Sequence, residues 1–280
     1  MLYAASGSLL LAYFSWRFIE QPLRDQKRVS NRVFYPVLGV ITCLFFGLGV
    51  YLHLSKGRLN RCPELAAEMD YTQYTDSARR FKSNVFTQSP NEKILVVGNS
   101  FARDFLNCGV ECNAFKGKEI VYVEEESANR FADIVITEEL GALLTAADKV
   151  VVSFDFGLLH ISRIKLGVEK LQNHTAARVC ILGCKNFGWN NNAVMLLPTS
   201  ERYKYRTKIL HEVIAANEKA KNVFGEKYID VLSLMDNGDG RVPVFSNDRK
   251  FLSQDRQHLT QAGALYVGNL IFRHYRFWNN

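Results

Sequence analysis

A serine, an aspartate and a histidine occupy positions in this sequence that suit nucleophilic catalysis. Ser100 comes two residues after the apolar run 93–98 (KILVVG), where a strand is expected to end. Asp255 and His258 are three residues apart, so a turn can place the carboxylate against one ring nitrogen of the histidine. The other ring nitrogen is then free to accept a proton from a hydroxyl group. A serine activated in this way forms an acyl-enzyme, so the pattern predicts acyl-transfer or ester-cleaving chemistry.

Each of these residues also has a structural interpretation. Asn99 and Ser100 are both favoured N-cap residues, so the serine taken alone is better explained as the cap of a helix. His258 can instead cap a helix or pack in the core, and Asp255 can simply be a turn residue. A serine after the first strand together with Asp-x-x-His before the last helix is more specific than either part. The Gly-x-Ser-x-Gly elbow of α/β-hydrolases does not occur in the sequence.

Short apolar runs alternate with helical patterns over residues 92–280. Near-continuous apolar runs are typical of parallel strands covered on both faces, and the alternation predicts an open, doubly wound α/β domain. Ligands bind at the carboxyl ends of the strands in such domains, which is where Ser100 is expected. The strands are predicted at residues 93–98, 119–125, 149–154, 177–183 and 227–234, and helices at 158–171, 198–224 and 259–277.

Charge and cysteine content exclude two classes of function. The chain has 35 Lys+Arg and 28 Asp+Glu, a net +7, of which residues 1–54 carry +3. The remaining +4 is too little for a nucleic-acid binder, and no basic stripe with interleaved aromatics occurs. No Cys-x-x-Cys pair is present, so no metal site is predicted. The cysteines after residue 54 are Cys62, Cys108, Cys112, Cys180 and Cys184. Their odd number requires a free thiol, and a bridge from Cys108 to Cys112 requires that their segment is not a regular helix.

The first 54 residues have the composition of membrane helices. Residues 33–54 contain no charged side chain, and a helix of this length spans about 33 Å, enough to cross a bilayer. Residues 1–16 are also uncharged, but they lack the basic start and the cleavage site of a signal peptide. They fit the second half of a spanning helix, so we expect the chain to be the tail of a longer polytopic protein.

The basic residues next to the predicted span indicate its orientation. Residues 17–32 contain five basic side chains, whereas Lys56, Arg58 and Arg61 follow the helix. The positive-inside rule therefore modestly favours residues 55–280 outside the cytoplasm.

Motifs at both ends of the chain resemble a known family. Gly98-Asn99-Ser100 resembles the first block, Gly-Asp-Ser, of SGNH/GDSL esterases. Asp255-x-x-His258, followed by Leu-Thr-x-x-Gly-Ala, resembles their last block. Residues 15–24 (SWRFIEQPLR) are similar to the Arg-Phe-Ile-Glu-x-Pro signature that closes the membrane domain of acyltransferase family 3. Bacterial O-acetyltransferases of surface polysaccharides fuse that domain to one further helix and a periplasmic SGNH domain.

The resemblance implies a fold class and a division of the chain. The fold is the SGNH (GDSL-like, flavodoxin-like) doubly wound parallel sheet, preceded by transmembrane helices. Residues 1–32 correspond to the end of the membrane acyltransferase domain, with its last helix and a cytoplasmic loop. Residues 33–54 are the transmembrane helix, 55–91 a linker and 92–280 the SGNH domain. The expected location is the bacterial inner membrane, with the SGNH domain in the periplasm.

The resemblance also implies roles for individual residues. Ser100 corresponds to the nucleophile, His258 to the general acid/base and Asp255 to the group that orients it. Asn99 replaces the aspartate of the esterases, and residues 154–157 (FDFG) lack the asparagine that the family places in its oxyanion hole. Only the backbone N–H of Ser100 is therefore assigned to that hole.

The implied reaction is O-acetylation of a cell-envelope polysaccharide such as O-antigen, capsule or a related glycan. No metal or cofactor is expected in this fragment; acetyl-CoA is implied as the donor through the upstream membrane acyltransferase domain. The implied partners are the polysaccharide acceptor, that domain and the lipid bilayer. The alternatives are a carbohydrate acetyl esterase of the SGNH class, or a membrane-anchored glycan-binding module with an unused triad. In residues 185–192 (KNFGWNNN), Trp189 and the asparagines, Asn186 among them, could contact a sugar or form only a polar loop.

Overall fold

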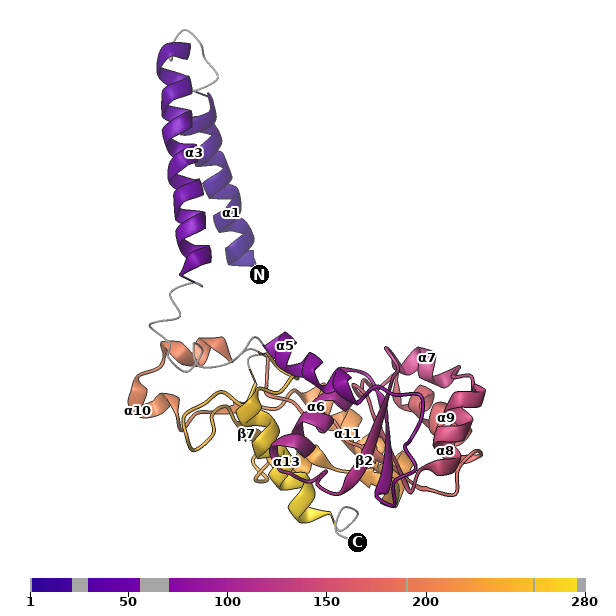
Figure 1. Ribbon diagram of the computed structural model, residues 1–280. Helices are drawn as coiled ribbons and strands as arrows, with labels where there is room; N and C mark the ends of the chain where they lie inside the picture. The colour runs from indigo at the N-terminus through magenta and orange to yellow at the C-terminus, as the bar shows by residue number, and fades with distance from the viewer. Residues whose placement is uncertain (1, 22–29, 56–70, 190, 254, 276–280) are drawn as a thin grey trace. The chain divides into compact units, whose positions relative to one another are not determined.

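The structure, a computed structural model, describes residues 2–21, 30–55, 71–189, 191–253 and 255–275. The chain forms two compact units, Met1–Cys62 and Pro63–Asn280 (Figure 1). Half of the predicted basic loop (residues 22–29 of 17–32) lies outside the described residues, as do Lys56, Arg58, Arg61 and Cys62.

The N-terminal unit consists of apolar helices. α1 (Leu2–Phe14) continues into the π-helical segment η1 (Ser15–Glu20), and α3 spans Asn31–Leu54. The 24 residues of α3 have a length of about 36 Å. Within the described ranges, α3 is the one helix long and apolar enough to cross a membrane, and it contains the predicted span 33–54.

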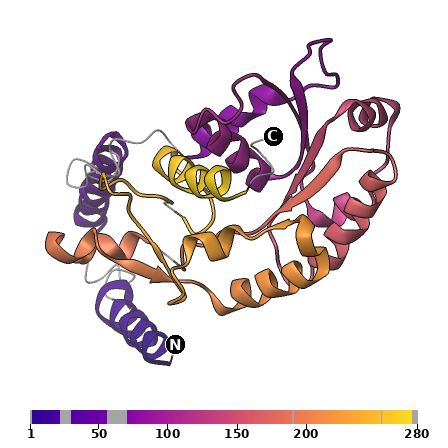
Figure 2. The same ribbon diagram turned by 90° about the horizontal axis from the view of Figure 1, so that it is seen from below.

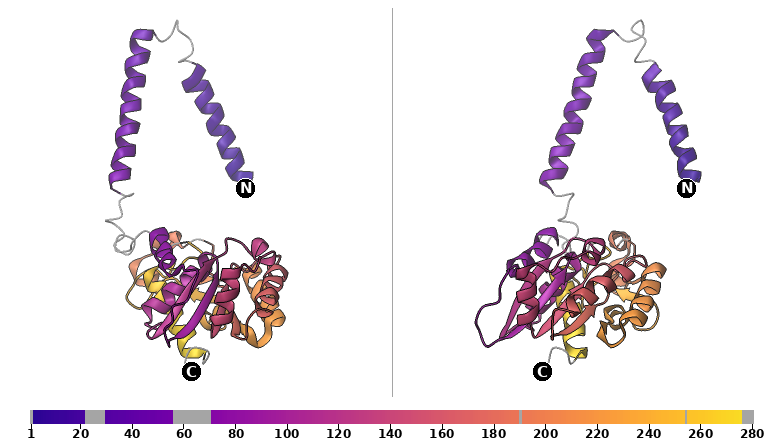
Figure 3. Two further views of the ribbon diagram at one scale, coloured as in Figure 1. Left: turned by 45° about the vertical axis from the view of Figure 1, so that its right-hand side comes forward. Right: turned by 90° about the vertical axis from the view of Figure 1, so that its right-hand side faces the viewer.

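The second unit is built on a parallel sheet of five strands in the order β2–β1–β3–β4–β6 (Figures 1 and 3). The first strand, β1, lies inside this sheet; β2 is added on one side of it, and β3, β4 and β6 follow on the other side, as in flavodoxin-like folds. The doubly wound α/β architecture predicted from the sequence is therefore confirmed. The strands are β1 (Glu92–Gly98), β2 (Lys118–Glu124), β3 (Lys149–Ser153), β4 (Arg178–Leu182) and β6 (Tyr228–Ile229).

Helices cover both faces of the sheet, as Figure 2 shows. α6 (Ser100–Glu111) and α13 (Gln261–His274) pack together on one face. The other face carries α7 (Ala128–Ala132), α8 (Glu138–Ala146), α9 (Ile161–Gln172) and α11 (His211–Phe224). Because both faces are covered, the side chains of residues 94–97 and 150–152 have no exposed surface. This burial explains why these runs are continuously apolar rather than alternating.

The helix predicted over residues 198–224 is wrong in its first half. The segment forms a short helix, α10 (Thr199–Arg202), then a strand, β5 (Arg206–Lys208), and only then α11. β5 pairs antiparallel with β7 (Arg241–Pro243) in a separate two-stranded sheet. This pairing overrides the helical pattern because tertiary contacts outweigh local propensity.

The strand predicted over residues 227–234 is also too long. β6 ends at Ile229, and the next residue, Asp230, is the N-cap of α12 (Val231–Met235). One carboxylate oxygen of Asp230 accepts the N–H of Ser233 at 3.1 Å. The cap therefore turns the chain into a helix within a run that is apolar enough to continue as a strand.

Residues 71–91, assigned by the sequence to the linker 55–91, pack on the domain. α5 (Tyr71–Asp76) and η3 (Ser77–Phe81) lie against α6. Tyr74 and Ala78 are buried there. The backbone of Lys82 forms an isolated parallel β-bridge with Tyr122 of β2. The α/β unit thus extends to residues before 92.

Cysteines in the described part of the chain are free thiols. Cys108 lies in α6, and Cys112 directly follows that helix, its N–H donating to the carbonyl of Cys108 at 3.1 Å. The segment is a regular helix, so the bridge that the sequence left open does not form.

Candidate active site

A tight turn at the end of β1 presents Ser100. Gly98 has a φ of +152°, and a Cβ at this position would lie 1.9 Å from the carbonyl oxygen of Ser153 on β3, so glycine is required. Asn99 caps α6, accepting the N–H of Phe101 on its Oδ1 at 3.0 Å. Ser100 is therefore the first residue of the helix rather than its cap, and its hydroxyl is not needed for capping.

The neighbouring strand β2 holds this turn in place. The hydroxyl of Tyr122 donates to the carbonyl of Gly98 at 3.0 Å, and the N–H of Glu125 donates to the same carbonyl at 2.9 Å. Tyr122 is buried, so the contact is shielded from water. The backbone before the serine is thus fixed from both sides, by β2 and by β3.

The structure brings Ser100, His258 and Asp255 together, although 158 residues separate the serine from the histidine. Nε2 of His258 lies 3.1 Å from Oγ of Ser100, and Nδ1 lies 2.6 Å from Oδ2 of Asp255. A proton on Nδ1 then donates to the carboxylate, and Nε2 accepts the serine hydroxyl. This is the geometry of an activated serine nucleophile.

The carboxylate of Asp255 is held by its own loop. Its Oδ1 accepts the N–H groups of Gln257 and His258, both at 2.7 Å, and the hydroxyl of Ser253 at 3.2 Å. Burial raises the pKa of this carboxyl group, but the hydrogen bonds from the His258 ring and the two backbone N–H groups outweigh it and lower the pKa to about 2. Asp255 is therefore ionised near neutral pH and keeps the proton of the imidazole on Nδ1.

Two asparagines of the loop after β4, Asn186 and Asn191, point into the protein rather than to solvent. Asn186 is buried, and its Oδ1 accepts the N–H groups of Gly188 and Leu210. Asn191 is fully buried, and its Nδ2 donates to the carbonyl of Ser253 at 3.4 Å. Both side-chain amides therefore hold backbone segments in place. Asn191 does so for the loop that carries Asp255.

Trp189 remains available to a ligand. Its side chain is 71% exposed, and the guanidinium of Arg256 lies 5.4 Å from the ring centre. Asn190 and the side chain of Asn192 lie outside the described residues. Of residues 154–157 after β3, Phe154 and Phe156 are buried and Asp155 is half-buried.

Sequence reasoning missed a buried ion pair next to these groups. Asp104 lies one helical turn after Ser100, and its carboxylate contacts the ammonium group of Lys185 at 2.9 Å. The available signals were a charged residue on the apolar side of α6 and a lysine in the loop after an apolar strand. Neither signal names its partner, since the two residues are far apart in the chain.

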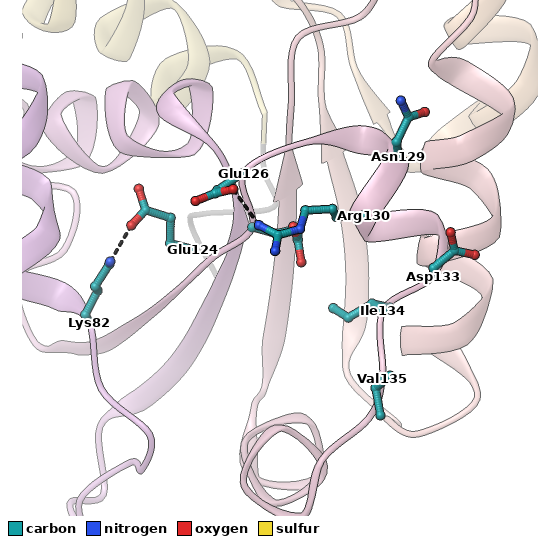
Figure 4. A pocket seen from close by; sticks show the side chains of 9 residues that line it. Lys82, Glu124, Glu126, Asn129, Arg130, Asp133, Ile134 and Val135 are labelled. Carbon is teal, nitrogen blue, oxygen red and sulfur yellow. Dashed lines mark hydrogen bonds and ion pairs between the residues drawn. The ribbon is translucent and has the colours of Figure 1, made fainter.

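A pocket opens at the carboxyl end of β2, lined by residues 124–126 and by residues between 129 and 135 (Figure 4). Its volume is about 690 Å³, within the usual range of ligand pockets. Figure 4 shows Lys82 paired with Glu124 on one side and Arg130 paired with Glu126 on the other. No cluster of three or more His, Cys, Asp or Glu side chains suited to a metal ion occurs in the part of the chain that the structure describes.

The chain was compared with protein families, with curated protein sequences and with solved structures, and only the solved structures match it. No family model and no curated protein sequence matches the chain. Among solved structures, it is similar to the periplasmic domain of a lipopolysaccharide acetyltransferase from Salmonella ser. Paratyphi A. The identity is 16% and the TM-score 0.54, over 75% of this chain and 98% of that one. The predicted fold class, an α/β fold with a central parallel sheet, is thereby confirmed.

Two lipase structures match with lower TM-scores. The lipase Lip_vut3 from a goat rumen metagenome is 10% identical, with a TM-score of 0.42, over 65% of this chain and 97% of that one. A possible lipase from Chitinophaga pinensis is 12% identical, with a TM-score of 0.35 and the same coverage.

Proposed function

We infer that this chain carries the catalytic domain of an O-acetyltransferase acting on a cell-envelope polysaccharide. The observation that carries the proposal is the pair of contacts from His258, 3.1 Å to Ser100 and 2.6 Å to Asp255, at the carboxyl end of β1. The fold shared with the periplasmic domain of a lipopolysaccharide acetyltransferase supports a glycan as acceptor.

The proposed reaction has two steps. Oγ of Ser100 attacks the acetyl carbonyl of the donor while Nε2 of His258 takes the hydroxyl proton; the proton then passes to the leaving group, and acetyl-Ser100 remains. In the second step a sugar hydroxyl gives its proton to Nε2 and attacks the acetyl group. Collapse of the intermediate releases the acetylated sugar and returns the proton to Ser100. Asp255 stays ionised throughout and stabilises the imidazolium.

The start of α6 is placed to stabilise the oxyanion. The N–H groups of the first helical turn have no partner in the helical ladder, and the helix dipole adds partial positive charge there. Asn99 takes up the N–H of Phe101, which leaves the N–H of Ser100 for the developing negative charge.

The membrane part of the proposal concerns the acetyl donor. α3 is proposed to cross the inner membrane, and residues 1–32 to end an acyltransferase family 3 domain that delivers acetyl groups from cytoplasmic acetyl-CoA. Residues 55–280 are then periplasmic. Alkaline phosphatase, which is active only outside the cytoplasm, should work when fused after Leu54. Activity only of a cytoplasmic reporter at this position would exclude both the periplasmic location and the envelope substrate.

Ser100→Ala tests the catalytic proposal. Acetylation of the envelope glycan in cells should be lost, and the purified full chain in detergent should no longer release 4-nitrophenol from 4-nitrophenyl acetate. Ser233→Ala is the matched control, because the Ser233 hydroxyl lies on α12 and donates to the carboxylate of the N-cap residue Asp230. Glycan acetylation that persists undiminished in Ser100→Ala would leave the binding-module interpretation.

The esterase alternative differs only in the acceptor, because water replaces the sugar hydroxyl in the second step. Incubation of the full-length protein with an acetyl ester and envelope glycan separates the two. A transferase yields acetylated glycan, whereas an esterase yields free acetate at a rate that the glycan does not change.

A further inference from the structure

A buried ion pair contacts the chain neighbours of both Ser100 and His258. The carboxylate of Asp104 is 1% exposed and the side chain of Lys185 is 6% exposed. Oδ2 of Asp104 lies 2.9 Å from Nζ of Lys185, and the same Nζ lies 3.7 Å from the ring centre of Phe101. Phe101 is the residue after Ser100, so the lysine packs against the start of α6 as well as against the aspartate.

The same carboxylate reaches the segment that carries the histidine. Oδ2 of Asp104 accepts the N–H of Leu259 at 3.3 Å, and Leu259 is the residue after His258. One buried oxygen therefore connects three parts of the fold: the nucleophile helix, the loop after β4 and the histidine loop. We propose that Asp104 and Lys185 are positioning residues that hold His258 at its distance from Ser100, an inference that rests on the proposed function.

The buried charges make a purely space-filling role a poor explanation. Charges are costly to bury, and apolar side chains of similar size often replace a buried ion pair without loss of stability. An apolar pair, however, has no oxygen that could accept the Leu259 N–H. In the ion pair, Lys185 holds the Asp104 carboxylate in place, and the fixed carboxylate oxygen accepts the backbone N–H of the histidine loop.

Lys185 also opposes the effect of burial on Asp104. Burial raises the pKa of the Asp104 carboxyl group, and the charge of Lys185 acts against that rise without cancelling it. A small internal cavity of about 10 Å³, lined by Asp104, Ser153 and Lys185 among others, adjoins the pair. It has room for about one water molecule. Loss of Lys185 would leave a buried carboxylate without its cation, and we expect the histidine loop to shift in response.

Catalysis is sensitive to such a shift. A displacement of about 1 Å between a nucleophile and its base can cost about 100-fold in rate, even when the altered residue is remote from the substrate. Neither Asp104 nor Lys185 contacts the sugar or the donor in the proposed reaction. The expected signature of their loss is therefore a lower kcat with an unchanged KM.

Two double variants of the full chain separate positioning from stability. Asp104→Asn with Lys185→Met removes both charges and keeps an oxygen that can accept the Leu259 N–H. Asp104→Leu with Lys185→Met removes the charges and the acceptor. Both pairs are uncharged and of similar volume, so both should fold with similar melting temperatures. Glu92→Gln is the control, because it breaks ion pairs with Lys118 and Lys149 at the far end of β1.

The readout is kcat and KM for 4-nitrophenyl acetate. The Asn/Met variant should lose about tenfold in kcat, because its amide oxygen can still accept the Leu259 N–H but no cation holds it in place, and the Leu/Met variant should lose roughly 100-fold with KM unchanged. Equal kcat values in the two double variants would overturn the positioning role, as would an equal loss in Glu92→Gln. Hydrolysis that does not depend on Ser100 at all would instead overturn the proposed function, which is a separate outcome.

Discussion

Replacing Asp255 by asparagine tests the proposed mechanism through the tautomer of His258. In the structure, Oδ1 of Asp255 accepts two backbone N–H groups at 2.7 Å, and Oδ2 faces Nδ1 of the histidine. In the variant, the amide oxygen must stay with the two N–H groups, because an NH₂ group there would oppose two donors. The NH₂ group then faces Nδ1, which must become an acceptor. The proton moves to Nε2, and the ring can no longer accept the proton of Ser100.

The size of the effect follows from this reversal. The corresponding change in a Ser-His-Asp protease lowers kcat by about 10⁴-fold through the same wrong tautomer. A loss of 10³- to 10⁴-fold corresponds to about 4–5 kcal/mol of transition-state stabilisation. His258→Ala should be more damaging, by about 10⁶-fold, because the base itself is then missing.

The assay is release of 4-nitrophenol by the full chain, with single-turnover acylation of Ser100 measured separately. Asp236→Asn is the matched control: its Oδ1 also accepts two backbone N–H groups, those of Gly238 and Gly240, but among the described residues it forms no hydrogen bond to a histidine. We expect the control to keep wild-type activity. A loss of less than tenfold in Asp255→Asn would refute the assignment of the tautomer to Asp255.

Three further predictions concern the frame of the site. Gly98→Ala should destabilise the fold by about 3 kcal/mol and abolish activity, since the new Cβ collides with a carbonyl of β3; Gly238→Ala, also at positive φ but in open space, should cost only about 1 kcal/mol in urea unfolding. Burial raises the pKa of the Cys180 and Cys184 thiols, the latter to about 12, so both should resist alkylation in folded protein and react after unfolding without reductant. A thiol that stays unlabelled after unfolding contradicts this. The pKa of Asp255 falls from 3.8 to about 2 on folding, so its stabilisation is present above pH 4 and is lost as the pH falls towards 2. Allowing for its partial exposure, we expect wild type to lose about 1 kcal/mol more than Asp255→Asn between pH 5 and pH 2, and an equal loss would refute it.

The sheet could be predicted from the sequence where its burial is uniform. Residues 94–97 are apolar without interruption because helices cover both faces of β1, and that pattern needs no knowledge of distant partners. β5 could not be predicted in this way. Residues 206–208 pair with residues 241–243, and this partner lies outside the segment from which the helix was predicted.

The candidate triad was recoverable for a similar reason. Ser100 follows an apolar run, and Asp255 and His258 are neighbours that a single turn brings together. Lys185 and Asp104 carry no such local signal. Their burial makes sense only when both are seen in contact, because an isolated buried charge would be strongly unfavourable. Sequence patterns thus reach functional groups at the ends of elements more readily than polar pairs within the core.

The structure also resolves a choice that sequence could not make at the start of α6. Asn99 and Ser100 are equally good caps, and a serine that caps its own helix would commit its hydroxyl to a backbone N–H. Because Asn99 takes the N–H of Phe101, Oγ of Ser100 is free to meet Nε2 of His258. Asn99, which stands where the esterase pattern has an aspartate, therefore caps the helix as an aspartate could. Unlike an aspartate, it places no negative charge beside the proposed oxyanion. The departure at residue 99 is thus compatible with an active serine.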